Sequence, residues 1–282
     1  MRVIVVYVKM NPTECYQRAT RTLKGRLISP YQHEGVAWLL DRETSTKGPR
    51  GGLLCDEMGL GKTVQLISAI LGNPEGRTLV VCPKSVVGQW ASEIEKFAPG
   101  LTVHVHQGLD RTTDYRTLTA DVTVTSYGCC VVKSTKAHPI AKTDIMPTVL
   151  HSVPWKRLIL DEAHEIREKK SKVTQSVKRL AGEIRWAVSG TPVFNSMKDF
   201  VSLAEFVGLA SKTVECFPQK VREKYVLRRT KQDLAHVNDR LSLPPCDFEN
   251  VELNMTPEEE VLYQEVFTEG REYIREVMAS AG

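Results

Sequence analysis

Several features that define special classes of protein are missing from this 282-residue sequence. No stretch approaches the roughly 20 consecutive apolar residues that are needed to cross a bilayer. The apolar run Val3–Val8 is too short for a secretory signal and ends at Lys9, so we interpret it as a buried strand. No repeat with a period of about 20 to 50 residues indicates a solenoid or a propeller. We therefore expect no membrane partner.

The seven cysteines are odd in number and include no Cys-x-x-Cys pair. This pattern argues against a disulfide framework and against a zinc site, and it predicts reduced thiols in the cytoplasm or nucleus. His104 and His106 alternate along an expected strand, but no cysteine or acidic cluster accompanies them. We predict no metal site there.

Acidic and basic residues are unevenly distributed, although the formal net charge of the chain is only +4. The segment 232–282 contains three Arg, no Lys and twelve Asp or Glu, a net charge of −9. The remaining 231 residues hold 35 basic and 22 acidic residues, a net charge of +13. A basic body with an acidic segment is typical of proteins that bind a polyanion, and a solvated surface of uneven charge explains it equally well.

Short apolar runs alternate with helical patterns, which is typical of a parallel sheet with helices on both faces. Strands are predicted at 52–55, 78–82, 103–106, 122–125, 157–160 and 185–188. Helices are predicted over Thr63–Leu71, where Val64, Ile67 and Leu71 share one face, and over Ser85–Phe97. The hydrophobic content of 41% is sufficient for such a core. The predicted fold class is α/β.

Two segments interrupt this alternation. Residues 129–154 contain Pro139, Pro147 and Pro154 and show little periodicity, which predicts an inserted surface loop. The run Thr256-Pro257-Glu258-Glu259 predicts a helix start, because Thr256 can cap, Pro257 suits the first helical position and Glu259 completes a capping box. The helix that follows reaches the last residue without a stop signal, so we expect the natural domain to continue beyond it.

A glycine-rich segment between a strand and a helix is the most specific feature, and it reads Asp56-Glu57-Met58-Gly59-Leu60-Gly61-Lys62-Thr63. Gly59 and Gly61 allow successive backbone N–H groups to face a phosphate, next to a helix N-terminus. Lys62 can reach the β- and γ-phosphates, and the Thr63 hydroxyl can coordinate Mg²⁺. Asp56 stands where the strict phosphate-loop pattern has its first glycine.

An acidic pair follows another apolar run, in Leu158-Ile159-Leu160-Asp161-Glu162-Ala163-His164. Ligands of open α/β sheets bind at the carboxyl ends of the strands, where this pair is expected. Asp161 can hold Mg²⁺, and Glu162 can orient and deprotonate an attacking water. Together with the phosphate loop, the pair predicts a site for nucleoside-triphosphate hydrolysis.

The two segments, DEMGLGKT and DEAH, resemble helicase superfamily 2, in particular its SWI/SNF-like branch of DNA-dependent ATPases. Further segments follow in the order of that family, over roughly Leu27–Val266: Tyr31-Gln32, Pro83-Lys84-Ser85 with Gln89-Trp90, Val124-Thr125-Ser126-Tyr127, Ser189-Gly190-Thr191-Pro192, Val226–Lys231 and Leu243-Pro244-Pro245. The pairs Arg185-Trp186 and Trp155-Lys156 are most similar to the helicase-like transcription factor and termination-factor ATPases.

The resemblance implies a RecA-like lobe, a parallel sheet between helices, that uses ATP and Mg²⁺. It assigns catalysis to Lys62, Asp161 and Glu162, and Mg²⁺ binding to Thr63 and Asp161. It assigns His164 to sensing the γ-phosphate. It places Gln32 against the adenine, and nucleotide contact on Asp56, Glu57, Met58, Gly59, Leu60, Gly61, Lys62 and Thr63.

The resemblance also implies sequence-independent contacts to the phosphates of double-stranded DNA, from Lys84, Ser85, Thr125 and Ser126. Lys169, Lys170 and Lys172 extend this basic track or form a solvated helix face. Arg228, Arg229 and Lys231 line DNA or support the packing of the lobe. The four tryptophans are interpreted as core residues, since three of them flank apolar runs.

We divide the chain into an N-terminal extension (1–26), an ATP-binding lobe (27–231) and an acidic helical exit (232–282) toward a second RecA-like lobe of the same full-length protein. That second lobe normally supplies an arginine-rich motif, and no Gln-x-x-Gly-Arg-x-x-Arg pattern follows Lys231. Because an arginine finger accelerates comparable hydrolases by about 10³ to 10⁵, we expect this chain to bind ATP but to hydrolyse it slowly.

Three functions fit the sequence. The first is ATP-driven translocation on double-stranded DNA with remodelling of bound proteins, such as a nucleosome, in the nucleus. The second is strand separation by a DNA helicase. The third is a non-catalytic nucleotide- or DNA-binding scaffold, which the intact Lys62, Thr63, Asp161 and Glu162 disfavour.

Overall fold

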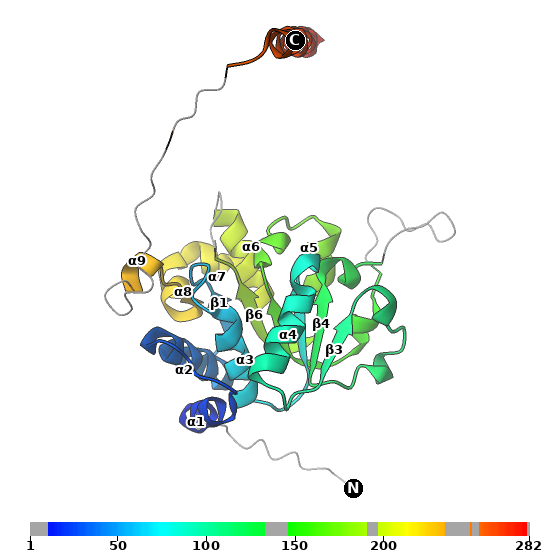
Figure 1. Ribbon diagram of the computed structural model, residues 1–282. Coiled ribbons are helices and arrows are strands. Elements are labelled where there is room, and N and C mark those ends of the chain that lie inside the picture. The colour runs from blue at the N-terminus through cyan, green and yellow to red at the C-terminus, as the bar shows by residue number, and fades with distance from the viewer. Residues whose placement is uncertain (1–10, 133–145, 191–196, 235–248, 250–253, 281–282) are drawn as a thin grey trace. The chain divides into compact units, whose positions relative to one another are not determined.

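The computed structural model describes residues 11–132, 146–190, 197–234, 249 and 254–280 (Figure 1). The strand predicted at Val3–Val8, the Thr191-Pro192 pair and the Leu243–Pro245 segment lie outside the described residues. By its internal contacts the chain divides into two compact units, 1–242 and 243–282. Each unit is described by itself.

A seven-stranded parallel sheet forms the centre of the first unit, in the order β3-β4-β2-β5-β6-β1-β7. The strands are β1 (Arg50–Leu54), β2 (Thr78–Cys82), β3 (Val103–His106), β4 (Val122–Ser126), β5 (Trp155–Leu160), β6 (Gly182–Val188) and β7 (Val226–Leu227). Since all seven strands run the same way, their carboxyl ends meet at one edge of the sheet. The segments that follow these ends build the site.

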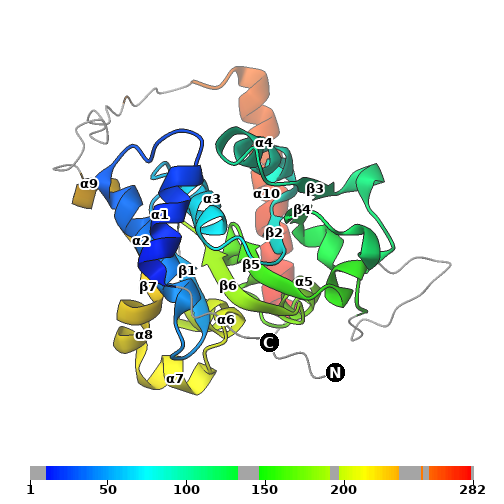
Figure 2. The ribbon, with the colours of Figure 1, turned by 90° about the horizontal axis from the view of Figure 1, so that it is seen from below.

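Helices cover both faces of the sheet (Figures 1 and 2). The first face carries α1 (Pro12–Thr22), α2 (Pro30–Thr44), α3 (Lys62–Gly72) and α4 (Val87–Phe97), and the second α5 (Lys172–Lys178), α6 (Met197–Val207), α7 (Ser211–Cys216) and α8 (Pro218–Tyr225). Along β5, Leu158 and Leu160 enter the core of the second face and Ile159 that of the first. A continuous apolar run thus supplies two cores, as expected for a strand buried on both faces.

The predicted α/β fold class is confirmed, and the six predicted strands all form, with some ends shifted. Helix α4 starts at Val87, two residues later than predicted, because Lys84–Val86 forms a 3₁₀ turn (η1). Strand β7 was not predicted, because two residues are too short for a recognisable pattern. Helix α9 (Lys231–Leu234) follows it.

Part of the predicted surface loop 129–154 belongs to the core. Cys130, Leu150 and Val153 are buried against the second face of the sheet, and Val149–Ser152 forms a 3₁₀ turn. The prolines therefore indicated irregular backbone correctly, but irregular backbone here does not lie only at the surface. Residues 133–145 lie outside the described part of the chain.

A buried ion pair connects the first layer of helices to the sheet. Arg157 of β5 donates to both carboxylate oxygens of Glu43 on α2, at 2.6 and 2.5 Å, and Trp186 of β6 donates to the same carboxylate at 2.9 Å. Both charged side chains are at most 1% exposed. With the Asn73 amide, which donates at 2.8 Å, four donors satisfy a carboxylate that burial alone would destabilise strongly.

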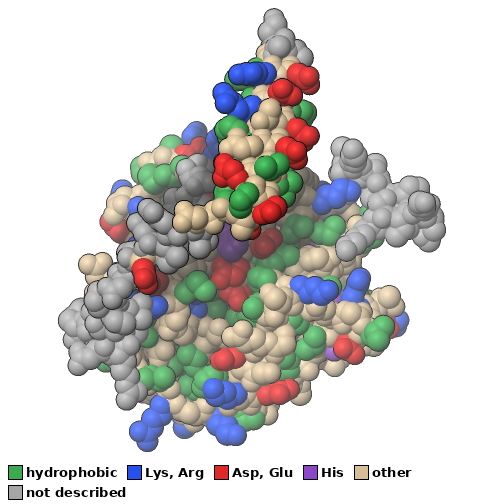
Figure 3. Space-filling model, turned by 45° about the horizontal axis from the view of Figure 1, so that its top comes forward, with side chains coloured by type: hydrophobic (Ala, Val, Ile, Leu, Met, Phe, Trp, Pro, Cys, Tyr) green, Lys and Arg blue, Asp and Glu red, His purple; other side chains and the backbone are tan. Residues whose placement is uncertain are grey.

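The described part of the second unit is mainly helix α10 (Pro257–Ser280), which starts as predicted. Thr256 N–H donates to the Glu259 carboxylate at 2.8 Å, and Glu259 N–H donates to Thr256 Oγ1 at 3.3 Å, which completes the capping box. Acidic and apolar side chains lie along its surface (Figure 3), among them Leu262, Val266 and Tyr273. Among the described residues, no helix is both long and apolar enough to span a membrane.

Candidate active site

Three chemically distinct segments meet at the carboxyl edge of the sheet. Because β5, β6 and β1 are neighbours, the segments after them lie side by side: Asp161-Glu162, Ser189-Gly190 and the phosphate loop 56–63. A Cβ added to Gly190 would lie 3.3 Å from Cγ of Met58 and 3.8 Å from Nζ of Lys62. The loop after β6 therefore packs directly against the phosphate loop.

The phosphate loop has the backbone that its glycines predict. Gly59 and Gly61 adopt φ values of 89° and 76°, which are left-handed conformations that residues with a Cβ rarely adopt. Gly61 immediately precedes the first turn of α3, so N–H groups at this helix start face the loop. The Lys62 ammonium donates to the carbonyls of Asp56 at 2.8 Å and of Glu57 at 3.3 Å. It thus lies inside the loop that a phosphate would occupy.

Gln32 of α2 lies against the same loop. Its amide donates to the Leu60 carbonyl at 3.4 Å, and its side-chain oxygen accepts the Ile28 N–H at 2.7 Å. A Cβ on Gly61 would approach Nε2 of Gln32 to 2.5 Å, so this contact requires glycine in the loop. The structure therefore brings Gln32 and the phosphate loop together, and the contact of Gln32 with adenine stays a prediction.

Asp56 is the loop residue whose surroundings differ most from expectation. Its side chain is fully buried and receives Arg229 Nε at 3.0 Å and Nη2 at 2.5 Å, together with the Arg229 backbone N–H at 3.1 Å. The Arg229 guanidinium also donates to the Tyr31 carbonyl and lies over the Tyr31 ring. In this structure the Asp56 carboxylate therefore holds Arg229, and only its backbone carbonyl faces Lys62.

Glu57 connects the phosphate loop to the segment 226–231, which contains Arg229. Its carboxylate accepts the Lys231 N–H at 2.7 Å, its own N–H donates to the Arg229 carbonyl at 2.9 Å, and Cys55 N–H donates to the Leu227 carbonyl at 2.7 Å. Of the two alternatives for Arg228, Arg229 and Lys231, the structure gives Arg229 the packing role, whereas Arg228 is exposed.

The Cys55 thiol beside this loop is not a reactive group. Burial, next to the charge of Asp56, raises the pKa of the Cys55 thiol to about 12, which keeps it protonated.

Asp161 and Glu162 are half-buried at the end of β5. Oδ2 of Asp161 accepts the indole N–H of Trp90 at 2.7 Å, and Oδ1 accepts the Glu162 N–H at 3.0 Å. Glu162 is left-handed, with φ of 48°, and is the one non-glycine residue in the described chain with positive φ. Its carboxylate lies 3.2 Å from Nδ1 of His164. Strained backbone of this kind is concentrated at functional sites.

The oxygen donors expected for Mg²⁺ have suitable chemistry and accessibility. Mg²⁺ prefers hard oxygen ligands and is usually bound by one or two carboxylates or hydroxyls together with phosphate and water. Thr63 lies at the start of α3 and Asp161 at the end of β5, and both are partly exposed at the same edge of the sheet. Among the described residues, no cluster of three or more His, Cys, Asp or Glu side chains forms a ready-made metal cage.

The four residues expected to contact DNA differ in their accessibility. Lys84 and Ser85 are exposed on η1, after β2. Thr125 is 0% exposed, and its hydroxyl donates to the His106 carbonyl at 2.8 Å, so this side chain joins β4 to β3 and does not face a ligand. Ser126 is buried with its Oγ 3.4 Å from Sγ of Cys129. The basic track is also interrupted, because Lys169 pairs with Glu205 at 2.8 Å.

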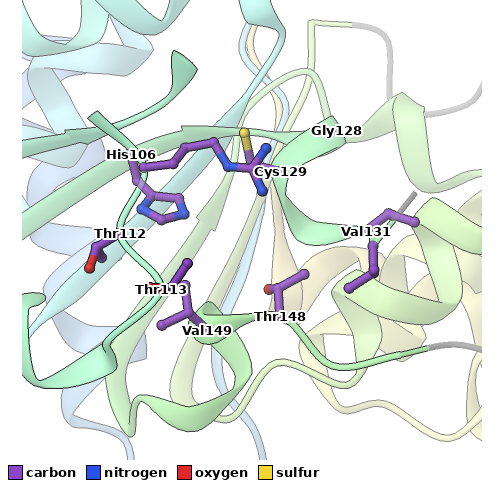
Figure 4. Close-up of a pocket in the computed structure, with 10 residues that line it drawn as sticks. His106, Thr112, Thr113, Gly128, Cys129, Val131, Thr148 and Val149 are labelled. Atoms are coloured by element: carbon purple, nitrogen blue, oxygen red, sulfur yellow. The ribbon is translucent and has the colours of Figure 1, made fainter. Parts of the chain in front are cut away.

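A cavity of about 400 Å³ lies beside β3 and β4, at the end of the sheet far from the phosphate loop (Figure 4). His106 and Cys129 point into it. Burial, followed by the nearby His104 and Arg111, lowers the pKa of His106 to about 4. Burial raises the pKa of the Cys129 thiol, but hydrogen bonds from Ser126 and Thr125 and the charge of Arg111 outweigh it and lower the pKa overall.

Sequence reasoning missed the contacts that orient the acidic side chains, although it named Arg229 and Trp90. Arg229 is 173 positions from Asp56, and Trp90 is 71 positions from Asp161. Trp90 was correctly predicted as a core residue, at 2% exposure, but its indole N–H reaches the site. Trp90 directly follows Gln89 and lies six residues beyond Lys84, within a segment that resembles the family. That position was the one signal in the sequence that Trp90 lies near the site.

The parallel sheet, the phosphate loop after β1 and the acidic pair after β5 define a RecA-like nucleotide-binding lobe. The chain belongs to the SNF2-related family, whose domain profile, the SNF2-related domain, matches residues 31–280. It is 31% identical to transcription termination factor 2 of Drosophila melanogaster over 88% of its own length, and 30% identical to the DNA repair protein RAD5B of Arabidopsis thaliana over 79%.

A solved structure supports the same assignment. The chain resembles the Sulfolobus solfataricus SWI2/SNF2 ATPase core in complex with double-stranded DNA, with 30% identity and a TM-score of 0.62 over 86% of this chain. It spans 52% of that core, 28% of transcription termination factor 2 and 22% of RAD5B. The SWI/SNF-like resemblance of the sequence and its RecA-like fold are thus confirmed.

Proposed function

We propose that this chain is the ATP-binding lobe of a DNA-dependent ATPase that translocates on double-stranded DNA and remodels protein–DNA complexes. The observation that carries this proposal is the position of the phosphate loop and the Asp161-Glu162 pair at the ends of β1 and β5, with only β6 between them. Such a site can hold a triphosphate and activate a water beside its terminal phosphate.

Each part of the proposed nucleotide site has a distinct role. The N–H groups of Gly59 to Thr63 surround the phosphates, and Lys62 leaves the Asp56 and Glu57 carbonyls to pair with them. Gln32 recognises the adenine, and His164 senses the γ-phosphate. Thr63 and Asp161 would hold Mg²⁺, which would supply positive charge beside the phosphates. Glu162 orients the attacking water and accepts its proton.

We further propose that duplex DNA lies along the carboxyl edge and contacts Lys84 and Ser85 through its backbone phosphates. Both side chains are exposed, and the similar archaeal core was solved in complex with double-stranded DNA. Ser126 contributes through the loop that it begins, and the buried Thr125 supports that loop from within. Contacts of this kind are independent of sequence and weaken with salt.

The proposed motor needs a second RecA-like lobe, which would follow the acidic segment 232–282 in the full-length protein and supply the arginine-rich motif. The target is a nucleosome or another DNA-bound protein, and the location is the nucleus. These proposals rest on family membership and on relatives named for transcription termination and DNA repair.

The decisive experiment separates binding from movement. We expect this chain to bind a fluorescent ATP analogue in the presence of Mg²⁺, and a Lys62→Ala variant to bind it at least tenfold more weakly. A version that carries the second lobe should hydrolyse ATP faster with duplex DNA and displace a protein bound to that DNA. Unwinding of a forked duplex would favour the helicase instead, and binding without any hydrolysis would favour the scaffold.

A further inference from the structure

Residue 161 has an unusual set of partners for a residue at a strand end. Its N–H donates to the Val81 carbonyl of β2 at 2.8 Å, its carboxylate accepts from Trp90, and its carbonyl accepts from Tyr127. Of these partners, Val81 and Trp90 belong to the segment that runs from β2 into α4, and Tyr127 follows β4, the strand next to β2. Both segments are those assigned to DNA above.

Trp90 connects Asp161 to the segment that carries Lys84 and Ser85. It lies one turn into α4, which begins directly after η1. Its ring packs with Val87 and Ile94 in the core of the first face, so its position is fixed by α4. The indole N–H is a donor only, and the 2.7 Å distance to Oδ2 of Asp161 is that of a charge-assisted hydrogen bond. Movement of α4 therefore moves one oxygen of Asp161.

Tyr127 connects Asp161 to the second segment. It follows Ser126 directly, and its hydroxyl donates to the Asp161 carbonyl at 2.8 Å. Tyr127 is buried, at 5% exposure, so its single phenol proton is directed to the Asp161 carbonyl. Cys82, which precedes the Pro83-Lys84 turn, is also buried beside Asp161.

We propose that Trp90 and Tyr127 are positioning residues that fix Asp161 for Mg²⁺ and transmit contact with DNA to it. The proposal rests on the proposed function, and it adds a route: each of the two loops assigned to DNA is followed by an aromatic side chain that donates to residue 161. DNA bound at Lys84, Ser85 and the loop after β4 then favours the orientation of Asp161 that holds the metal.

The physical basis is the sensitivity of metal ligands to their own hydrogen-bond partners. Loss of such a partner typically lowers metal affinity by about 10- to 100-fold, although the partner never touches the metal. Because coupling between two binding sites is reciprocal, Mg²⁺ with nucleotide should also raise the affinity for DNA. A side chain that only fills the core would change neither affinity selectively.

The test measures binding by the chain itself. The affinity for a fluorescent ATP analogue is measured with Mg²⁺ and with EDTA, and the ratio of the two dissociation constants reports the metal contribution. Trp90→Phe should reduce this ratio about tenfold and leave the affinity in EDTA unchanged. Tyr127→Phe should reduce it less, because its hydroxyl bonds the carbonyl and not the carboxylate.

A matched control is available at Trp155, which is also 2% exposed and donates its indole N–H, at 2.9 Å, to the Leu150 carbonyl. Trp155→Phe removes the same group from the opposite core and should leave the ratio unchanged. If Trp90→Phe does not fold, benzothienylalanine at position 90 keeps the two-ring shape and removes only the N–H. The same ratio is then measured on that variant.

Coupling to DNA is read from the same titrations with a short duplex present. In the unaltered chain the duplex should increase the Mg²⁺ contribution, and in the Trp90 variant this increase should disappear. The proposal is overturned if a folded Trp90 variant keeps the ratio within twofold, if Trp155→Phe changes it equally, or if the duplex has no effect on the unaltered chain. Absence of all nucleotide binding by the unaltered chain would overturn the proposed function as well.

Discussion

The chain contains two Asp-Glu pairs, each beginning within two residues of the end of a buried strand at the carboxyl edge of the sheet, yet their surroundings are opposite. Asp56 is fully buried in an ion pair with Arg229, and Glu57 accepts the Lys231 N–H. Asp161 and Glu162 remain half-exposed, and the donors that reach Asp161 are an indole and a backbone N–H. Asp56 of the first pair is therefore bonded to a positively charged side chain, whereas the donors to the Asp161 carboxylate are both neutral.

This difference in hydrogen-bond partners indicates different roles for the two pairs. A carboxylate already neutralised by a guanidinium gains little from a metal ion, whereas one held by neutral donors keeps its charge available. The first pair therefore fastens the C-terminal segment 226–231 to the phosphate loop. The second pair is the one that we propose for chemistry. The dipeptide itself is the same in both places, so the partners decide the role.

The largest expected effect separates the second residues of the two pairs. In a version that carries the second lobe, Glu162→Gln should lower ATP turnover by about 10² to 10⁴, because an amide cannot accept the proton of the attacking water. Glu57→Gln should keep turnover within a few-fold, since its amide oxygen can still accept the Lys231 N–H. Steady-state hydrolysis with saturating DNA measures both. Equal losses in the two variants would remove the distinction.

The next largest effect is on the free energy of unfolding, and it compares the surroundings of Asp56 and Asp161. Arg229→Ala leaves the buried Asp56 charge without its partner and should lower the free energy of unfolding by about 3–5 kcal/mol. Urea unfolding measures the loss. Arg228→Ala, at an exposed neighbour, should change it by less than about 0.5 kcal/mol.

A further comparison keeps this result open to contradiction. Asp161→Asn should cost less than about 1.5 kcal/mol, because the amide oxygen can still accept one of the two N–H donors and water can reach the other at this half-exposed position. A loss at Asp161→Asn as large as that at Arg229→Ala would mean that both pairs are structural.

The sequence predicted the local features of the two pairs and not their partners. The phosphate loop was predictable from Gly59, Gly61 and Lys62. These residues are close together in the sequence, and they supply the backbone conformation and the positive charge that bind a phosphate. Strands such as β5 were predicted from a continuous apolar run. The Arg229–Asp56 ion pair joins residues 173 positions apart, through a two-residue strand, and no local pattern reports such a contact.

Thr125 shows the converse failure. Its position next to the end of β4 suggested a surface contact, but β4 is buried at all five positions, and the Thr125 hydroxyl bonds the neighbouring β3. A motif position thus predicts that a segment lies at the site, but burial of the strand on both faces decides which of its side chains can face a ligand.

A smaller effect tests whether the cluster around Asp56 depends on close packing. A Cβ on Gly35 of α2 would lie 1.8 Å from Oε1 of Gln65 and 2.8 Å from Nη2 of Arg229. Gly35→Ala should therefore cost about 1–3 kcal/mol, since Gln65 and Arg229 must both move. Gly88→Ala in α4 is the control, because its Cβ would meet nothing within 4 Å. There the substitution should be neutral or stabilise by up to about 1 kcal/mol, as helix propensity predicts.

The smallest effect tests the strain in the second pair. Glu162 has φ of 48°, whereas Glu57 has no positive φ. A glycine relieves left-handed strain, so Glu162→Gly should be more stable to urea than Glu162→Ala by about 1 kcal/mol. At position 57 the order should reverse, because glycine there adds only conformational entropy to the unfolded chain. Using alanine as the reference at each position removes the contribution of the lost carboxylate. If the same order were found at both positions, the strain would not distinguish the pair assigned to chemistry from the pair assigned to structure.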